Sequence, residues 1–114
     1  GTCTFLGATA DTSLGTVTNS CAIGFGASVD ASNTMVLGNA SLTLVRPGVD
    51  GTVELGNDTF RWERVRAITV STGDLELKSE DGRAHWLIEE GEDSVFFTNR
   101  RNGKRYRAVL EEVA

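Results

Sequence analysis

Apolar positions in the first half of the chain recur in a fixed relation to glycine. Four segments align, 4–7, 21–24, 35–38 and 53–56, and each ends in glycine directly after Leu or Ile. The positions one and three residues before the glycine share strand parity, so they point to one face. The pattern predicts short strands that alternate with glycine turns. The residues assigned to that inward face are Leu6, Cys21, Ile23, Met35, Leu37, Val53 and Leu55.

A short strand followed by a glycine turn that recurs along the chain is typical of a β-roll or β-solenoid. Each unit presents only one or two medium-sized apolar side chains, too few to bury without neighbours. Three copies around one axis would cover the apolar column, so we expect the inward face to form the core of a homotrimer. Cys3 has the opposite parity to Cys21, so a disulfide between them is not expected. The alternative is an irregular linker rich in Gly, Ser and Thr.

The distribution of charge supports a division of the chain near Gly56. The sequence has 114 residues, 13 of them Gly, and a net charge of −5. Its charged residues gather after Gly56, whereas glycine gathers before it. We therefore expect a repeat shaft or head over 1–56, a connector over 57–73 and a small antiparallel β domain over 74–114. The start at Gly1 rather than Met indicates a fragment or a processed product.

Alternating polar and apolar residues predict four strands in the last segment. The strands are separated by turn sequences at 80–82, 91–93 and 99–104. Short strands with tight turns are typical of an antiparallel meander, and Asn102-Gly103 favours a type I′ turn. The fold class is therefore all-β, with a homotrimeric β-roll or β-solenoid-like segment followed by a small antiparallel meander.

The repeat also resembles known families. Residues 19–29 and 31–39 resemble the head repeats of trimeric autotransporter adhesins, which read approximately N-S-x-A-I-G-x-x-A. Similar repeats occur in trimeric phage tail fibres, and Leu55 to Trp62 resembles a fibre phrase, L-G-x-x-x-x-R-W. The resemblance covers about residues 2–64. It implies a left-handed parallel β-roll in a homotrimer. The irregular spacing and Arg46-Pro47-Gly48 depart from the family pattern after Val45.

Catalytic chemistry is not supported by the sequence. His85 is the one histidine, and no local nucleophile and base accompany it. The paired carboxylates 89–90, 92–93 and 111–112 are interpreted as solvated surface, because adjacent residues of a strand face opposite sides. We expect no enzyme activity, no metal site and no cofactor, and no apolar run is long enough for membrane insertion.

A basic cluster near the C-terminus is the candidate binding surface. Basic residues interleaved with an aromatic residue suit anionic partners, but the whole chain is acidic, so we expect no nucleic-acid binding. An anionic glycan on a cell surface fits the same cluster better. The candidate surface-binding residues are Arg100, Arg101, Lys104, Arg105 and Tyr106.

The resemblance implies a structural and adhesive function in the virion, as part of a phage tail fibre or similar receptor-binding appendage. The expected partners are further copies of the chain, other tail or appendage proteins, and a glycan or protein of the host surface. Two alternatives stay open. One is a fragment of a bacterial trimeric surface adhesin, located at the bacterial cell surface. The other is a non-catalytic part of a polysaccharide-degrading tailspike.

Overall fold

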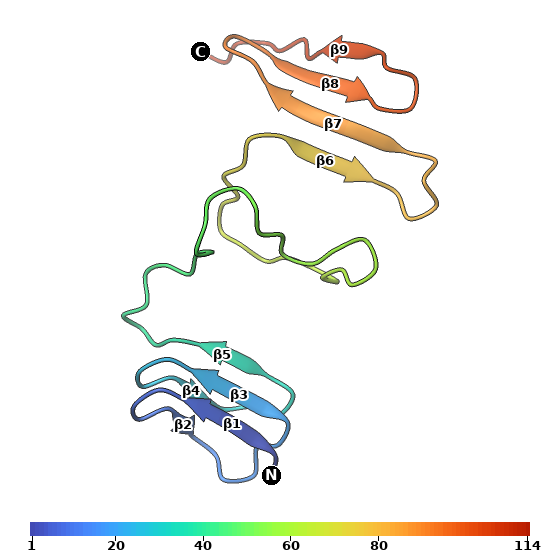
Figure 1. Cartoon of the computed structure of the whole chain (residues 1–114). Helices are drawn as coiled ribbons and strands as arrows, with labels where there is room; N and C mark the ends of the chain where they lie inside the picture. The colour runs from blue at the N-terminus through green and yellow to red at the C-terminus, as the bar shows by residue number, and fades with distance from the viewer. The chain divides into compact units, whose positions relative to one another are not determined.

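The computed structural model describes residues 1–114 and contains strands but no helix, so the all-β prediction is confirmed. The chain divides into two compact units, Gly1–Thr59 and Phe60–Ala114 (Figure 1). The first unit holds two parallel sheets, and the second holds one antiparallel sheet. The strands are β1 Cys3–Leu6, β2 Asp11–Thr12, β3 Ser20–Ile23, β4 Ser28–Val29, β5 Met35–Leu37, β6 Leu75–Lys78, β7 His85–Glu90, β8 Val95–Asn99 and β9 Arg105–Arg107.

The glycine-aligned segments set the register of the larger parallel sheet, β1-β3-β5. Leu6 pairs with Ile23, and Ile23 pairs with Leu37. The backbone ladder continues into the glycines, because the N–H of Gly24 donates to Leu6 O at 2.8 Å and that of Gly38 donates to Ile23 O at 2.7 Å. The first three predicted strands are therefore present and stacked in parallel.

A small core lies between this sheet and the two-stranded sheet β2-β4. Its buried members are Val17, Ala22, Ala27 and Val29. Ala22, from β3, and Val29, from β4, have no exposed surface. Small side chains at these positions allow two layers of very short strands to pack closely.

Glycine and asparagine hold the corners of the repeat. Gly7 has a φ of 131°, and a Cβ added there would lie 2.6 Å from the carbonyl oxygen of Gly24. Asn19 and Asn33 also have positive φ values, 51° and 59°. Their side chains form a ladder in which Asn19 Nδ2 donates to Asn33 Oδ1 at 2.8 Å. These corners require residues that tolerate the left-handed region.

The fourth expected strand, over Val53–Gly56, is absent, so that part of the prediction is wrong. The parallel pairing ends at β5, and no strand lies between β5 and β6. Pairing already stops at Leu37, well before Pro47. At Gly38 the nearest atoms to an added Cβ belong to the Leu42 side chain, whereas at Gly7 and Gly24 they belong to the glycine of the next rung. The sequence match at Leu55-Gly56 therefore does not extend the sheet.

The second unit is an antiparallel sheet with strand order β6-β7-β8-β9. This confirms the predicted meander of consecutive strands. Ser79–Gly82 turns between β6 and β7, with Gly82 N–H donating to Ser79 O at 3.1 Å. Polar turn residues thus set each reversal of the chain.

The β8–β9 turn differs from the expected type I′. That turn needs positive φ at both central residues, whereas only Gly103 of the Asn102-Gly103 pair has it, at 73°. The loop is longer: Asn99 N–H donates to Lys104 O, and Gly103 N–H donates to Asn99 O, both at 2.8 Å. Asn102 Oδ1 instead accepts from the N–H of Lys104 at 2.9 Å.

Candidate assembly and binding surfaces

Seven residues are expected to point toward a trimer axis. Five of them lie on the outer face of the β1-β3-β5 sheet, the face turned away from the small core. Leu6, Met35 and Leu37 are 64%, 65% and 50% exposed, and Cys21 and Ile23 are half-buried. The register places these side chains in neighbouring strands at matching positions. They form a continuous apolar surface, which we call the outer apolar face.

The two faces of β3 differ in side-chain size. The interior position is occupied by Ala22, which has no exposed surface, whereas the neighbouring Ile23 points outward. The register places Phe5 of β1 and Val36 of β5 in the same row as Ala22, so the interior row is not small throughout. The outer apolar face nevertheless leaves several large aliphatic side chains accessible.

Two of the expected residues do not join this face. Val53 and Leu55 are 62% and 79% exposed and lie beyond the last strand of the sheet. The cysteines also divide: both are free, and Cys3 Sγ contacts Val17 O at 3.3 Å beside the interior core. Cys21 lies on the outer apolar face beside Met35.

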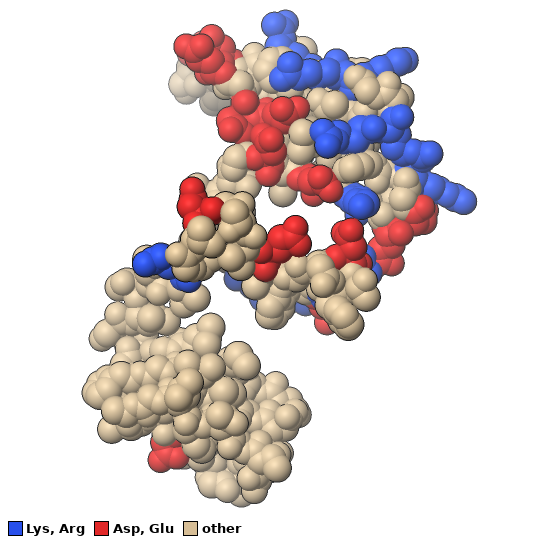
Figure 2. Space-filling view, in the orientation of Figure 1, with Lys and Arg blue, Asp and Glu red and all other residues tan.

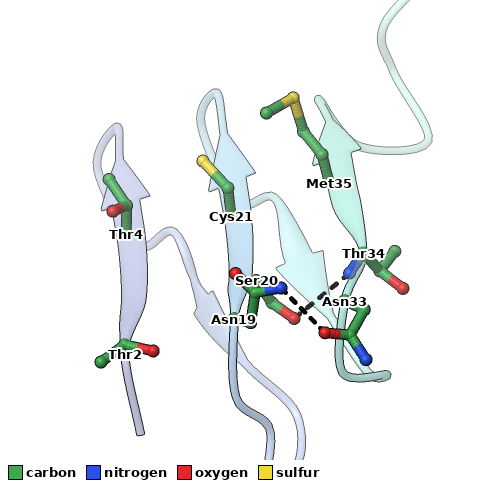
Figure 3. A pocket seen from close by; sticks show the side chains of 8 residues that line it. All are labelled: Thr2, Thr4, Asn19, Ser20, Cys21, Asn33, Thr34 and Met35. Carbon is green, nitrogen blue, oxygen red and sulfur yellow. Dashed lines mark hydrogen bonds between the residues drawn. The ribbon is translucent and has the colours of Figure 1, made fainter.

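A polar hollow of about 330 Å³ adjoins the outer apolar face (Figure 3). The Asn19–Asn33 ladder runs along it, and Thr34 N–H approaches Ser20 Oγ at 3.4 Å. These Asn-Ser and Asn-Thr pairs lie just before the glycine-aligned segments 21–24 and 35–38. Each pair lies the same number of residues before the glycine of its rung. This equal spacing predicts that the pairs stack in one column. The hollow is lined by Thr2, Thr4, Asn19, Ser20, Cys21, Asn33, Thr34 and Met35.

The basic cluster of the second unit lies on the β8–β9 hairpin. Arg101 Nη1 donates to the carbonyl of Arg83 at 2.7 Å. The guanidinium carbon of Arg105 lies 3.9 Å from the centre of the Phe96 ring, a cation–π contact. The carboxylates that contact a basic residue do so elsewhere, at Arg61, Arg83 and the imidazole of His85. The hairpin cations Arg100, Arg101, Lys104 and Arg105 are thus open to an external anion. Figure 2 shows basic side chains gathered on this unit.

Tyr106 is separated from these cations by the pleat of β9. Its ring lies 6.0 Å from that of Trp86, on the opposite face of the sheet from Arg105. The structure therefore brings the hairpin cations together but does not bring Tyr106 among them. Its side chain belongs to an apolar sheet face instead.

His85 and the neighbouring β6–β7 turn both have contacts with carboxylates. His85 Nε2 lies 3.3 Å from Glu76 Oε1 across β6 and β7. The Ser79 hydroxyl donates to Asp81 Oδ1 at 2.8 Å inside the turn. Arg83 N–H and Ser79 Oγ–H, in that order, hold the pKa of the Asp81 carboxyl below its usual value. The hydrogen bonds of Ser79 and Asp81 close the β6–β7 turn.

Comparison with protein-family models, curated proteins and solved structures finds no match. The structure has no helix of the length and apolar character needed to cross a membrane. It also brings together no group of three His, Cys, Asp or Glu side chains suited to a metal ion. The functional interpretation therefore depends on the outer apolar face and the basic hairpin.

Proposed function

We propose that this chain is a structural and adhesive segment of a homotrimeric phage tail fibre or a similar receptor-binding appendage. In this proposal the two parallel sheets form a short β-roll, and the outer apolar faces of three copies meet on the trimer axis. The chain acts in the virion by assembly and binding, without catalysis. Its partners are its own copies, other appendage proteins and a component of the host surface.

The observation that carries the proposal is the column of exposed apolar side chains on the outer face of β1-β3-β5. Ala22 fills the interior, while Ile23 and Leu37 face outward at paired positions. Burial of a Leu or Ile side chain contributes about 1.5–3 kcal/mol, so an uncovered apolar column leaves substantial stabilisation unused. A three-fold axis covers equivalent columns from three copies at once.

Molar mass by light scattering is the first test. We expect a particle of three chains, each of 12.2 kDa. A monomer at micromolar concentration would overturn the trimer proposal.

Cys21 provides a local reporter of the proposed axis. In a Cys3→Ser background, we expect Cys21 to resist a thiol reagent in the folded protein, because reaction requires access to the thiol. The substitution Met35→Asp places a charge directly beside Cys21. Met35 is 65% exposed in the single chain, so Asp there disturbs the isolated fold little. We expect it to make Cys21 reactive, because an unpaired charge is strongly disfavoured on an apolar axis.

Leu14→Asp is the matched control for this measurement. Leu14 is 52% exposed and lies in the loop between β2 and β3, away from the outer apolar face. Cys21 should stay protected in this variant. Free reaction of Cys21 in the Cys3→Ser protein without a further substitution would show that the outer apolar face is open. That result would refute the proposed axis.

The adhesive part of the proposal is supported by the basic hairpin. Arg100, Arg101 and Lys104 gather at one turn without carboxylate partners. Three copies on one axis would present three such turns, so weak single contacts would add through avidity. We expect retention on an immobilised sulfated dextran that weakens with salt, and no retention on uncharged dextran.

The Arg100→Gln/Arg101→Gln variant should lose this retention. Arg64→Gln/Arg66→Gln removes the same charge from a different part of the second unit and serves as control. Equal loss in both variants would assign the retention to net charge and remove the hairpin from the proposal.

Two alternative hypotheses for the biological setting stay open besides the tail fibre. A bacterial trimeric surface adhesin would have the same assembly, and its parent gene would encode a membrane anchor. A tailspike would carry its catalytic part elsewhere. Release of new reducing ends from capsule polysaccharide by this chain alone would contradict a non-catalytic role.

A further inference from the structure

The second unit has an apolar sheet face with no cover. No residue of Phe60–Ala114 is buried, although the unit contains large aromatic and aliphatic side chains. One cross-strand row joins Leu75 to Ile88, Ile88 to Phe97 and Phe97 to Tyr106. Leu77 and Trp86 form a second row on the same face. We call these six residues the meander apolar face.

The opposite face of the sheet is mainly polar, with Leu87 and Phe96 as its apolar members. Glu76 contacts His85, and the Thr98 hydroxyl donates to Glu89 Oε1 at 3.2 Å. The Arg105 guanidinium covers the Phe96 ring. This face is suited to solvent, so the missing cover is required on the meander apolar face only.

The chemistry of the hollow on this face identifies the kind of occupant. The hollow has a volume of about 440 Å³ and is lined by Leu77, Trp86, Phe97 and Tyr106. Its accessible lining is apolar, so a bound sugar would lose hydrogen bonds to its hydroxyl groups there. Apolar side chains of a protein partner fill such a hollow without this loss.

Charge on the two free edges of the sheet favours another copy of the same sheet as that partner. Glu76 stands on the β6 edge and Arg105 on the β9 edge, at the two ends of one cross-strand row. Three strand spacings of about 4.8 Å separate them within a chain, so they do not pair there. A ring of copies continues the row from Arg105 of one chain to Glu76 of the next. The acidic edge also has Asp74, Glu80 and Asp81 beside the basic Lys78, and the basic edge has Lys104 and Arg107. Glu80 and Asp81 also contact Arg61 and Arg83 within the chain.

We infer that the meander apolar face is closed by the same face of two further copies of this chain, with the acidic β6 edge of each copy beside the basic β9 edge of the next. This inference rests on the proposed homotrimer. It adds a second assembly surface, separate from the outer apolar face, and makes the core of the second unit entirely intermolecular. It also turns the face bearing Arg105 outward.

Trp86 reports on this face after Trp62→Phe removes the other tryptophan. In the full chain we expect Trp86 to be protected from quenching by acrylamide. Phe97→Asp places a charge on the meander apolar face and should raise quenching to the level of the urea-unfolded chain. Phe96→Asp is the matched control, because the same change on the same strand faces the opposite side. Trp86 should stay protected in this control.

The edge charges test the identity of the partner. Arg105→Glu and Glu76→Lys should each lower the urea concentration at which Trp86 becomes exposed. The combined variant restores opposite charges between neighbouring copies and should recover part of the midpoint. The contacts of Glu76 with His85 and of Arg105 with Phe96 within the chain stay lost. Additive losses in the combined variant would overturn the edge-to-edge arrangement, because the two residues lie at opposite edges within one chain.

The outcomes separate this inference from the proposed function. Protected Trp86 with reactive Cys21 in a three-chain particle would refute the outer apolar face as an axis and support the meander face. Protected Cys21 with freely quenched Trp86 would support the proposed axis and overturn this inference. Trp86 that is quenched freely until an oligosaccharide is added would identify a sugar as occupant and overturn it as well.

Discussion

The two units differ in where their apolar side chains find cover. The first unit builds two layers from short parallel strands and fully buries Ala22, Ala27 and Val29. The second unit has longer strands and more aromatic residues, but its single layer buries none of them. Apolar content alone therefore does not create a core; a second layer has to lie against it.

The same difference separates intrinsic stability from stability gained by assembly. Stacked rungs in the first unit satisfy their backbone groups and align Asn19 with Asn33. Their interior is closed before any partner binds. The second unit has a complete hydrogen-bonded meander and an open apolar face, so its rigidity depends on what covers that face. The first unit should therefore have a stable interior even in a variant that does not assemble.

Val29→Asp is expected to have the largest effect on this comparison. Val29 has no exposed surface, and an unpaired carboxylate in its place costs more than about 4 kcal/mol. Hydrogen exchange should show loss of protection throughout β1–β5. Ser28→Asp, one residue earlier and exposed, should leave that protection intact. Equal damage from both substitutions would contradict a closed interior between the two parallel sheets.

Gly7→Ala should have the next largest effect. The added Cβ meets the Gly24 carbonyl oxygen at 2.6 Å, and the φ of 131° is itself unfavourable for alanine. We expect a loss of about 3 kcal/mol in the unfolding free energy of the first unit, measured by urea titration. The backbone of the next rung has to move to relieve this contact.

Gly103→Ala separates the steric cost at Gly7 from the cost of its positive φ. Gly103 has a φ of 73° but open space around its Cβ position, so only the conformational cost applies. We expect about 1 kcal/mol there. A cost at Gly7 no greater than that at Gly103 would show that the rungs are not closely stacked.

The sequence predicted the elements whose pattern is local. Leu-Gly and Ile-Gly at each rung placed β1, β3 and β5, because glycine is required where one rung crosses close to the next. Alternation and turn residues placed β6 to β9. The predicted parity of Ile23 and Ala22 also agrees with the two faces of β3.

The predictions that the structure corrected concern features that local sequence patterns do not specify. Val53–Gly56 repeats the motif, yet pairing stops at Leu37 and the Leu42 side chain lies beside Gly38 in place of a further rung. Tyr106 follows Arg105 in sequence but lies on the other face of β9. The loop at Asn102-Gly103 is selected by the whole Asn99–Lys104 connection rather than by the two residues alone. Each outcome depends on pairing over several residues.

Asp81 gives the smallest expected effect and tests a turn of the second unit separately from its apolar face. Its Oδ1 accepts hydrogen bonds from Arg83 N–H at 3.0 Å and from the Ser79 hydroxyl at 2.8 Å. These bonds hold the pKa of Asp81 below its usual value. The folded form thus binds its proton less readily than the unfolded form, so the turn is stabilised above about pH 4 and this contribution is lost as pH falls further. Asp81→Asn keeps the acceptor without titrating, and hydrogen exchange at Ala84 should become less dependent on pH. If that exchange is equally pH-dependent in both proteins, another group controls the turn, and the difference between the units lies in the covered face alone.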